Sequence, residues 1–164
     1  MGELQAHIST DASPERLWSV ATDWPNQGQW IPFTRSRLTG GGRTGTGSRI
    51  EAWTGIGRVG FLDVMIVEVW TPPSRLELRH IGKIVRGSAG FVIEPLGARG
   101  SRIVWWERID LPLGVLGRLA WPVVERVSRW TLQRSLRKLA AIASAAPAAP
   151  TAPTAPAGPA GPAG

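Results

Sequence analysis

Apolar and polar residues alternate in short stretches between about residue 47 and residue 111, and glycine or proline separates one stretch from the next. Alternation with a period of two is typical of strands that bury one face, with the glycines and prolines at the turns. After this region the apolar residues recur with helical spacing. The order predicts an α+β fold, in which a curved antiparallel sheet is closed by one long C-terminal helix and an apolar cavity lies between them.

Two short helices are expected between the first strand and the rest of the sheet. The alternating stretch 3–10 suits a first strand. Ser13 is suited to cap a helix, Pro14 to occupy its first position, and Glu15 to face the positive end of the helix dipole. A second short helical turn then leads to Trp30.

The C-terminal helix is expected to begin between Leu113 and Gly117 and to bend or restart at Pro122, which cannot donate the usual backbone hydrogen bond. Its apolar stripe consists of Leu116, Leu119, Val123, Val127, Trp130, Leu136, Leu139 and Ala140. A basic amphipathic helix can lie on an anionic membrane, but a helix that closes a sheet also needs such a stripe, so we expect it to pack on the sheet. The bend near Pro122 and the segment 111–117 are the expected gate of the cavity.

Length and composition indicate one folded domain, residues 1–143, followed by a disordered tail, residues 144–164. From Pro147 onward proline recurs at every third position among alanine, threonine and glycine, which prevents helix and sheet. The chain has no cysteine, so disulfides and thiolate metal sites are excluded. With neither a secretory signal nor an apolar run long enough to span a membrane, a cytoplasmic location and no stable membrane insertion are expected.

The formal charge of +7 does not indicate a nucleic-acid partner. It comes from 17 arginines and 2 lysines against 12 acidic residues, and the arginines are spread along successive strands rather than clustered among aromatic residues. We therefore expect them to be ordinary solvated positions.

Several site types are not supported by the motifs. The cluster Gly40–Gly47 lacks the Gly-Lys-Ser/Thr ending of a phosphate loop and leads into an expected strand, so it is interpreted as a connection. No metal and no cofactor are expected, because only His7 and His80 are present and no carboxylates cluster with them. A serine-hydrolase elbow is also absent from the sequence.

The chain resembles the START-like, or SRPBCC, superfamily over about residues 3–143. The resemblance is carried by Ala12-Ser13-Pro14-Glu15-Arg16-Leu17-Trp18, Asp23, Trp30-Ile31-Pro32, Pro72-Pro73-Ser74-Arg75-Leu76, Gly100-Ser101-Arg102-Ile103-Val104-Trp105, Leu132, Leu136 and Leu139. It implies the helix-grip fold: about seven antiparallel strands, two short helices after the first strand, and a long helix over the concave face. It also implies a cavity for a hydrophobic ligand, because members include polyketide cyclases and aromatases, coenzyme Q-binding proteins and lipid carriers.

Charged residues at odd positions place the even residues of the stretch 75–80 on the inner face. With a two-residue turn at Pro72-Pro73, the expected pairs are Leu76 with Val69, Leu78 with Val67 and His80 with Met65. With a second such turn at Gly82-Lys83, the expected pairs are His80 with Val85 and Leu76 with Ala89, which turns Phe91 and Ile93 inward. In the last strand Arg102 and Arg108 mark the outer face, so Trp105 and Glu107 are expected inside.

Three ionisable residues therefore fall on the inner face: Asp63, His80 and Glu107. Asp63 lies diagonally across from His80, roughly 7–8 Å away between backbones, and we hypothesise that it orients His80 as a polar contact or general acid/base for a bound carbonyl compound. The alternative is a structural histidine bonded to backbone or water. Glu107, roughly 17 Å from His80 in this register, either anchors a ligand hydroxyl with a raised pKa or pairs with a basic residue of the C-terminal helix.

The expected function is the binding of a small hydrophobic molecule such as a lipid, a quinone or a polyketide. The expected ligand-binding residues are Trp30, Phe61, Met65, Val67, Leu78, His80, Phe91, Trp105, Glu107, Leu116, Val123 and Val127. One alternative is a polyketide cyclase/aromatase or dehydratase that uses His80, Asp63 or Glu107 for proton transfer. Another is an interaction module with a collapsed cavity. The protein is expected to be a monomer or homodimer.

Overall fold

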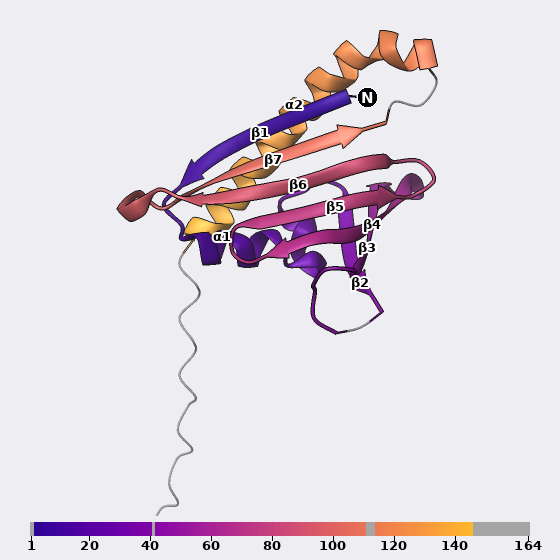
Figure 1. The fold of residues 1–164 in the computed structure, drawn as a ribbon. Helices are drawn as coiled ribbons and strands as arrows, with labels where there is room; N and C mark the ends of the chain where they lie inside the picture. Colours follow the sequence, from indigo (N-terminus) through magenta and orange to yellow (C-terminus); the bar gives the residue numbers. More distant parts are fainter. Residues whose placement is uncertain (1, 41, 111–113, 146–164) are drawn as a thin grey trace, which may run out of the picture.

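A computed structural model of the chain describes residues 2–40, 42–110 and 114–145. Its elements follow the order expected from the sequence (Figure 1). They are β1 (Gly2–Thr10), α1 (Pro14–Ala21), the 3₁₀ helix η1 (Trp24–Gln29), β2 (Thr34–Thr39), β3 (Arg49–Ile56), β4 (Val59–Thr71), β5 (Arg75–Ile81), β6 (Arg86–Pro95), the 3₁₀ helix η2 (Gly97–Arg99), β7 (Ser101–Ile109) and α2 (Gly114–Ser144). The expected tail lies outside the described residues from position 146 onward.

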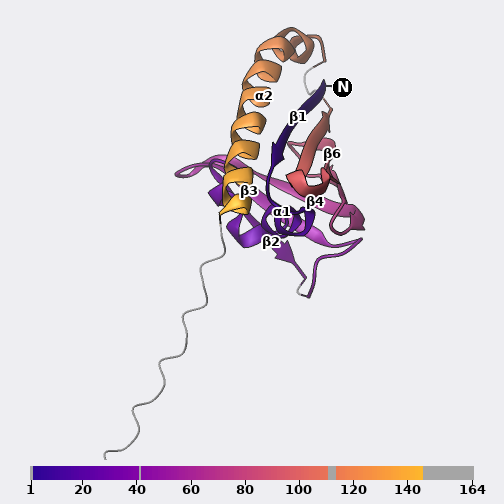
Figure 2. The ribbon, with the colours of Figure 1, turned by 90° about the vertical axis from the view of Figure 1, so that its left-hand side faces the viewer.

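The seven strands form one antiparallel sheet in the order β1-β7-β6-β5-β4-β3-β2. Figures 1 and 2 show α2 running along β1 on one side of the curved sheet, with α1 near the C-terminal end of α2. The core lies between these layers and includes Leu4, Leu17, Ile103 and Leu136, all almost fully buried. The α+β helix-grip fold is therefore confirmed.

The first helix begins as its sequence predicts. The side chain of Ser13 accepts a hydrogen bond of 3.2 Å from the backbone N–H of Arg16, Pro14 occupies the first turn, and Glu15 lies at the positive end of the dipole. Leu17 and Trp18 lie on the inner side of this helix, where both are buried. The short helix thus positions a tryptophan against the floor of the sheet.

The register between β4 and β5 is only partly as expected. Met65 pairs with His80 and Val67 with Leu78, which confirms these two predictions. The predicted pairing of Leu76 with Val69 is wrong, because three residues, 72–74, connect the strands instead of two, which places Trp70 opposite Leu76. The register shift between Val67 and Val69 restores the predicted pairs further along the strands. A β-bulge inserts one residue into one strand, and no turn signal in the sequence marks this position.

The predicted pairing of β5 with β6 is wrong by two residues. Four residues, 82–85, connect the strands instead of two, so His80 lies opposite Gly87 and Leu76 opposite Phe91. A shift of two residues preserves the face to which each side chain points, which explains why Phe91 and Ile93 are nevertheless buried. However, the shift changes which residues of the two strands lie opposite each other.

The prediction that the whole apolar stripe of α2 packs on the sheet is also wrong. Its C-terminal half is buried through Leu132, Leu136, Leu139, Ala140 and Ala143. In the N-terminal half Val123, Val124, Val127 and Trp130 are exposed. Figure 2 shows this half of α2, coloured orange, curving as it passes the N-terminal end of β1. Pro122 lies inside a continuous helix, and the expected gate at 111–117 falls partly outside the described residues.

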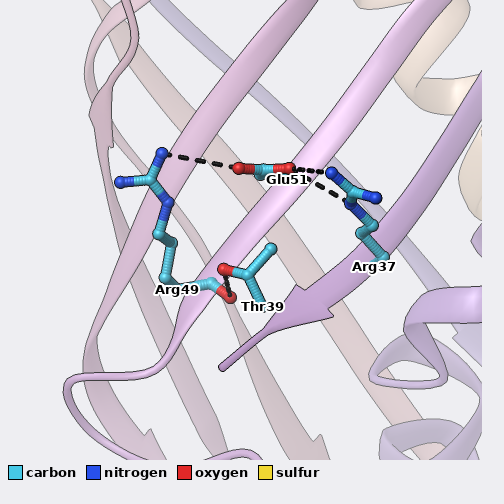
Figure 3. Close-up of polar contacts among 4 residues, drawn as sticks. All are labelled: Arg37, Thr39, Arg49 and Glu51. Carbon is cyan, nitrogen blue, oxygen red and sulfur yellow. Dashed lines mark hydrogen bonds and ion pairs between the residues drawn. The ribbon is translucent and has the colours of Figure 1, made fainter. Parts of the chain in front are cut away.

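The outer face of the sheet carries ion pairs. Glu51 on β3 accepts hydrogen bonds from Arg37 on β2 and from Arg49, at 2.6 Å and 3.4 Å (Figure 3). The hydrogen bond and charge of Arg37 hold the pKa of Glu51 below its ordinary value. The Thr39 hydroxyl donates to the backbone carbonyl of Arg49 beside this cluster. These arginines therefore occupy solvated positions and form surface ion pairs, each of which contributes little to stability.

Candidate functional site

A cavity of about 390 Å³ lies between α2 and the inner face of the sheet. Its floor contains the small residues Ala52, Ala89 and Gly90. A Cβ added to Gly90 would lie 2.4 Å from the carbonyl oxygen of Leu76, so no larger residue fits at this position without moving the backbone. The short side chains of Ala52 and Ala89 leave space beneath the helix, whereas Gly90 borders the cavity with its backbone and would direct a side chain toward Trp106 on the other face.

Aromatic side chains form the walls of this cavity. The rings of Trp30 and Trp105 pack edge to face with 5.5 Å between centroids, and Trp18 packs in the same way against Phe91 at 5.5 Å. Large aromatic pairs of this geometry hold each other in place. Because Trp30, Phe91 and Trp105 border the cavity, its walls are rigid and mainly apolar.

Most of the residues expected to bind ligand border this cavity. They are Trp30, Phe61, Met65, Leu78, Phe91, Trp105, Glu107 and Val127. Val67 lies instead in the packed core, where it is 1% exposed. Val123 is 70% exposed, because it lies on the side of α2 opposite the buried Leu132 and Leu136. The side chain of Leu116 lies outside the described residues.

Asp63 and His80 meet at one end of the cavity. The Nδ1 atom of His80 lies 2.8 Å and 3.0 Å from the two carboxylate oxygens of Asp63. Asp63 borders the cavity, whereas His80 lies behind it, with a side chain that is 8% exposed. The Nε2 atom of His80 is buried and has no hydrogen-bond partner within the described part of the chain. The geometry expected for this pair is therefore present, with the carboxylate rather than the imidazole nearest to a ligand.

Glu107 on β7 completes a polar group at this end. Glu107 pairs with Ala89, and Ala89 pairs with Leu78. The predicted pairing of Ala89 with Leu76, which placed Glu107 level with Leu76, is therefore wrong. With the corrected register, strand geometry puts the backbone of Glu107 roughly 12 Å from the backbone of His80. The distance of roughly 17 Å expected from the sequence is therefore too long.

Burial raises the pKa of Glu107 above its ordinary value. The charge of His80 opposes this change in pKa, the charge of Asp63 adds to it, and a hydrogen bond from the Trp105 side chain opposes it. In the described part of the structure, the charged groups that act on Glu107 are thus His80 and Asp63. A carboxyl group that retains its proton can donate a hydrogen bond to a ligand oxygen.

Two further polar groups lie in residues of the cavity wall: one belongs to Trp30, an expected ligand-binding residue, and the other to Ser36, which was not among the expected site residues. The indole N–H of Trp30 and the hydroxyl of Ser36 are buried without partners in the described part of the structure. Ser36 could have been found from the sequence, because it alternates with the outward Arg35 and Arg37. In the same wall the hydroxyls of Thr34 and Thr54 lie 3.0 Å apart.

Neither a metal cluster nor a membrane span is found in the described ranges. Among their His, Asp and Glu residues no group of three or more could hold a metal ion. Within the same ranges, no helix has the length and hydropathy required to cross a bilayer.

Solved structures with this arrangement are similar in fold although not in sequence. TTHA0849 from Thermus thermophilus superposes with a TM-score of 0.72 at 19% identity, covering 87% of this chain and 97% of its own. The Zhui aromatase/cyclase from a Streptomyces species superposes with a TM-score of 0.70 at 13% identity, covering 87% of this chain and 93% of its own. No curated protein sequence matches the chain.

The family described as "Polyketide cyclase / dehydrase and lipid transport" matches residues 1–144, which include all the strands and helices described above. This match confirms the resemblance to the SRPBCC superfamily that the N-terminal helix motif and the closing leucines indicated. The chain therefore belongs to the polyketide cyclase/dehydrase and lipid transport family.

Proposed function

We propose that this protein binds a small hydrophobic molecule, such as a lipid, a quinone or a polyketide-like compound, in the cavity beneath α2. The observation that supports this function is the hollow itself, with a volume of about 390 Å³ and a mainly apolar, aromatic lining. Ligand sites in proteins have volumes of about 300–1,000 Å³ and the same kind of lining. A core that served stability alone would be filled, because protein interiors are close-packed.

The polar groups of the wall define the chemistry of the ligand further. Trp30, Ser36 and Glu107 all border the cavity. Burial raises the pKa of Glu107, and a carboxyl group that retains its proton can donate a hydrogen bond to a carbonyl or hydroxyl oxygen of a ligand. The ligand that we propose is therefore an oxygenated hydrophobic molecule rather than a plain hydrocarbon.

Filling the cavity is expected to abolish binding. Native mass spectrometry of the purified chain should show a bound molecule, and 1-anilinonaphthalene-8-sulfonate should bind with increased fluorescence. Ala52→Phe places a ring in the floor and should weaken binding of this probe at least about tenfold. Ala98→Phe adds the same ring at an exposed turn and should not change it. Equal probe binding by both folded variants would contradict the proposal.

Dehydration or cyclisation of a β-hydroxy ketone is the second candidate function, favoured by two carboxyl groups on one cavity. The Asp63 carboxylate would accept the proton α to the carbonyl while the carbon–carbon double bond forms, and Glu107 would protonate the departing hydroxyl, which leaves as water. A proton passed from Asp63 to Glu107 would complete the cycle. One solved structure with the same fold is named an aromatase/cyclase.

The catalytic candidate predicts turnover of a β-hydroxy ketone whose product is a conjugated, ultraviolet-absorbing enone. Glu107→Gln and Asp63→Asn should each lower the rate by about a hundredfold, since each removes one proton transfer. Glu94→Gln, on the exposed end of β6, serves as the control. If the wild-type protein does not accelerate the reaction, the dehydratase function fails while ligand binding is unaffected.

A further inference from the structure

The exposed side of α2 carries apolar residues that the fold does not use. Val123, Val127 and Trp130 are separated by four and three residues, so they lie on one side of the helix. They are 70%, 59% and 63% exposed, while Leu132 and Leu136 bury the opposite side. Closure of the sheet therefore does not account for these three side chains, and a basic amphipathic helix would be expected to expose them only for a partner.

The same side of the helix continues as a row of cations. Arg134, Arg137 and Lys138 are exposed and follow Trp130 with the same spacing. We call the six residues Val123, Val127, Trp130, Arg134, Arg137 and Lys138 the α2 outer face. The guanidinium of Arg134 lies 5.7 Å from the ring centre of Trp130. An apolar half thus meets a basic half at a tryptophan, the residue that favours the membrane–water interface.

Charge selects among the possible partners of this face. The only acidic residue of α2 is Glu125, and Arg129 pairs with it at 3.0 Å. A second copy of the chain would place like charges against each other, because a two-fold interface brings the same patch together. An anionic lipid surface matches both halves, since the acyl boundary accepts valine and tryptophan and the headgroups attract arginine and lysine.

We propose that the α2 outer face docks this protein on anionic lipid surfaces. The helix lies in the interface without crossing it, with Val123, Val127 and Trp130 among the acyl chains and the basic residues among the headgroups. Val127 belongs to this face and also borders the cavity, so docking brings the cavity to the lipid. The proposal stands independently of the cavity's ligand, because the other five residues of the α2 outer face do not border the cavity.

Vesicle binding by the full chain tests this surface. The wild-type protein should sediment with vesicles of phosphatidylcholine mixed with phosphatidylglycerol, but not with phosphatidylcholine alone, and high salt should release it. The triple variant Arg134→Gln, Arg137→Gln, Lys138→Gln should bind about a hundredfold more weakly, given the contribution of each basic residue near a membrane. Trp130→Ala should weaken binding by about tenfold and, being exposed, should leave the fold intact.

The matched control removes the same charge elsewhere. Arg43→Gln, Arg58→Gln, Arg99→Gln neutralises three exposed arginines outside α2 and the strands and should keep binding within about threefold of wild type. An equal loss of vesicle binding in both triple variants would show unspecific attraction and overturn the proposal. Failure of the wild-type protein to bind anionic vesicles would also overturn it. Dimers that dissociate on Trp130→Ala, without vesicle binding, would assign the face to self-association instead.

Discussion

The variant Gly87→Ala is expected to lose about 3 kcal/mol or more of unfolding free energy. Gly87 has φ +125°, which side chains with a Cβ rarely adopt, and an added Cβ would lie 2.0 Å from the backbone carbonyl oxygen of Arg108. That oxygen belongs to β7, so relief requires a shift of the strand. Since β7 also carries Glu107, the variant should change the cavity as well as the stability, as measured by urea unfolding and probe binding.

Gly97→Ala separates the two causes of this loss. Gly97 also has a positive φ, +63°, but no atom lies within 4 Å of an added Cβ. This variant should lose only the conformational cost of about 1–2 kcal/mol. If both variants unfold at the same urea concentration, the close approach of β6 and β7 at Gly87 does not add to the loss of stability in Gly87→Ala.

The stability of Glu107→Gln should depend less on pH than that of the wild-type protein. Burial raises the folded-state pKa of Glu107 above its ordinary value of 4.5, so between these two pKa values the folded state holds a proton that the unfolded state has released. The stabilisation is complete below about pH 4.5 and is lost as the pH rises through the folded-state pKa, at up to about 1.4 kcal/mol per pH unit. Glutamine stays neutral at every pH, so the variant has no pH-dependent change in stability from this position.

The measurement is a series of urea unfolding curves between about pH 4 and pH 8. The stability of Glu107→Gln relative to wild type should rise over this window and then become constant. Glu94→Gln, at an exposed position of β6, should run parallel to wild type. A Glu107→Gln curve that is also parallel would show that the carboxyl group is not held neutral by burial.

Local signals in the sequence determined the elements and the faces of the strands. Ser13 and Pro14 fixed the start of α1, because a cap and a restricted φ act within a few residues. Alternation placed Leu78 and Phe91 inside, and this parity holds although the register of β6 is shifted by two residues. The proximity of Asp63 and His80 also followed, because the extra residue of the bulge in β4 offsets a connection of three residues, 72–74, where two were predicted.

Tertiary structure alone decided three features. They are the register of β5 with its two neighbouring strands, the proximity of Glu107 to Asp63 and His80, and the exposure of part of the apolar stripe of α2. A bulge or a longer turn depends on how neighbouring strands twist and pack, so it leaves no periodic signal, yet it changes which residues share a row. The helical pattern revealed an apolar stripe in α2 but not how far the sheet extends beneath it. Val123 and Leu136 both belong to the predicted stripe, but in the folded helix Val123 lies on the outer side and Leu136 on the side that packs against the core, so one is exposed and the other is buried.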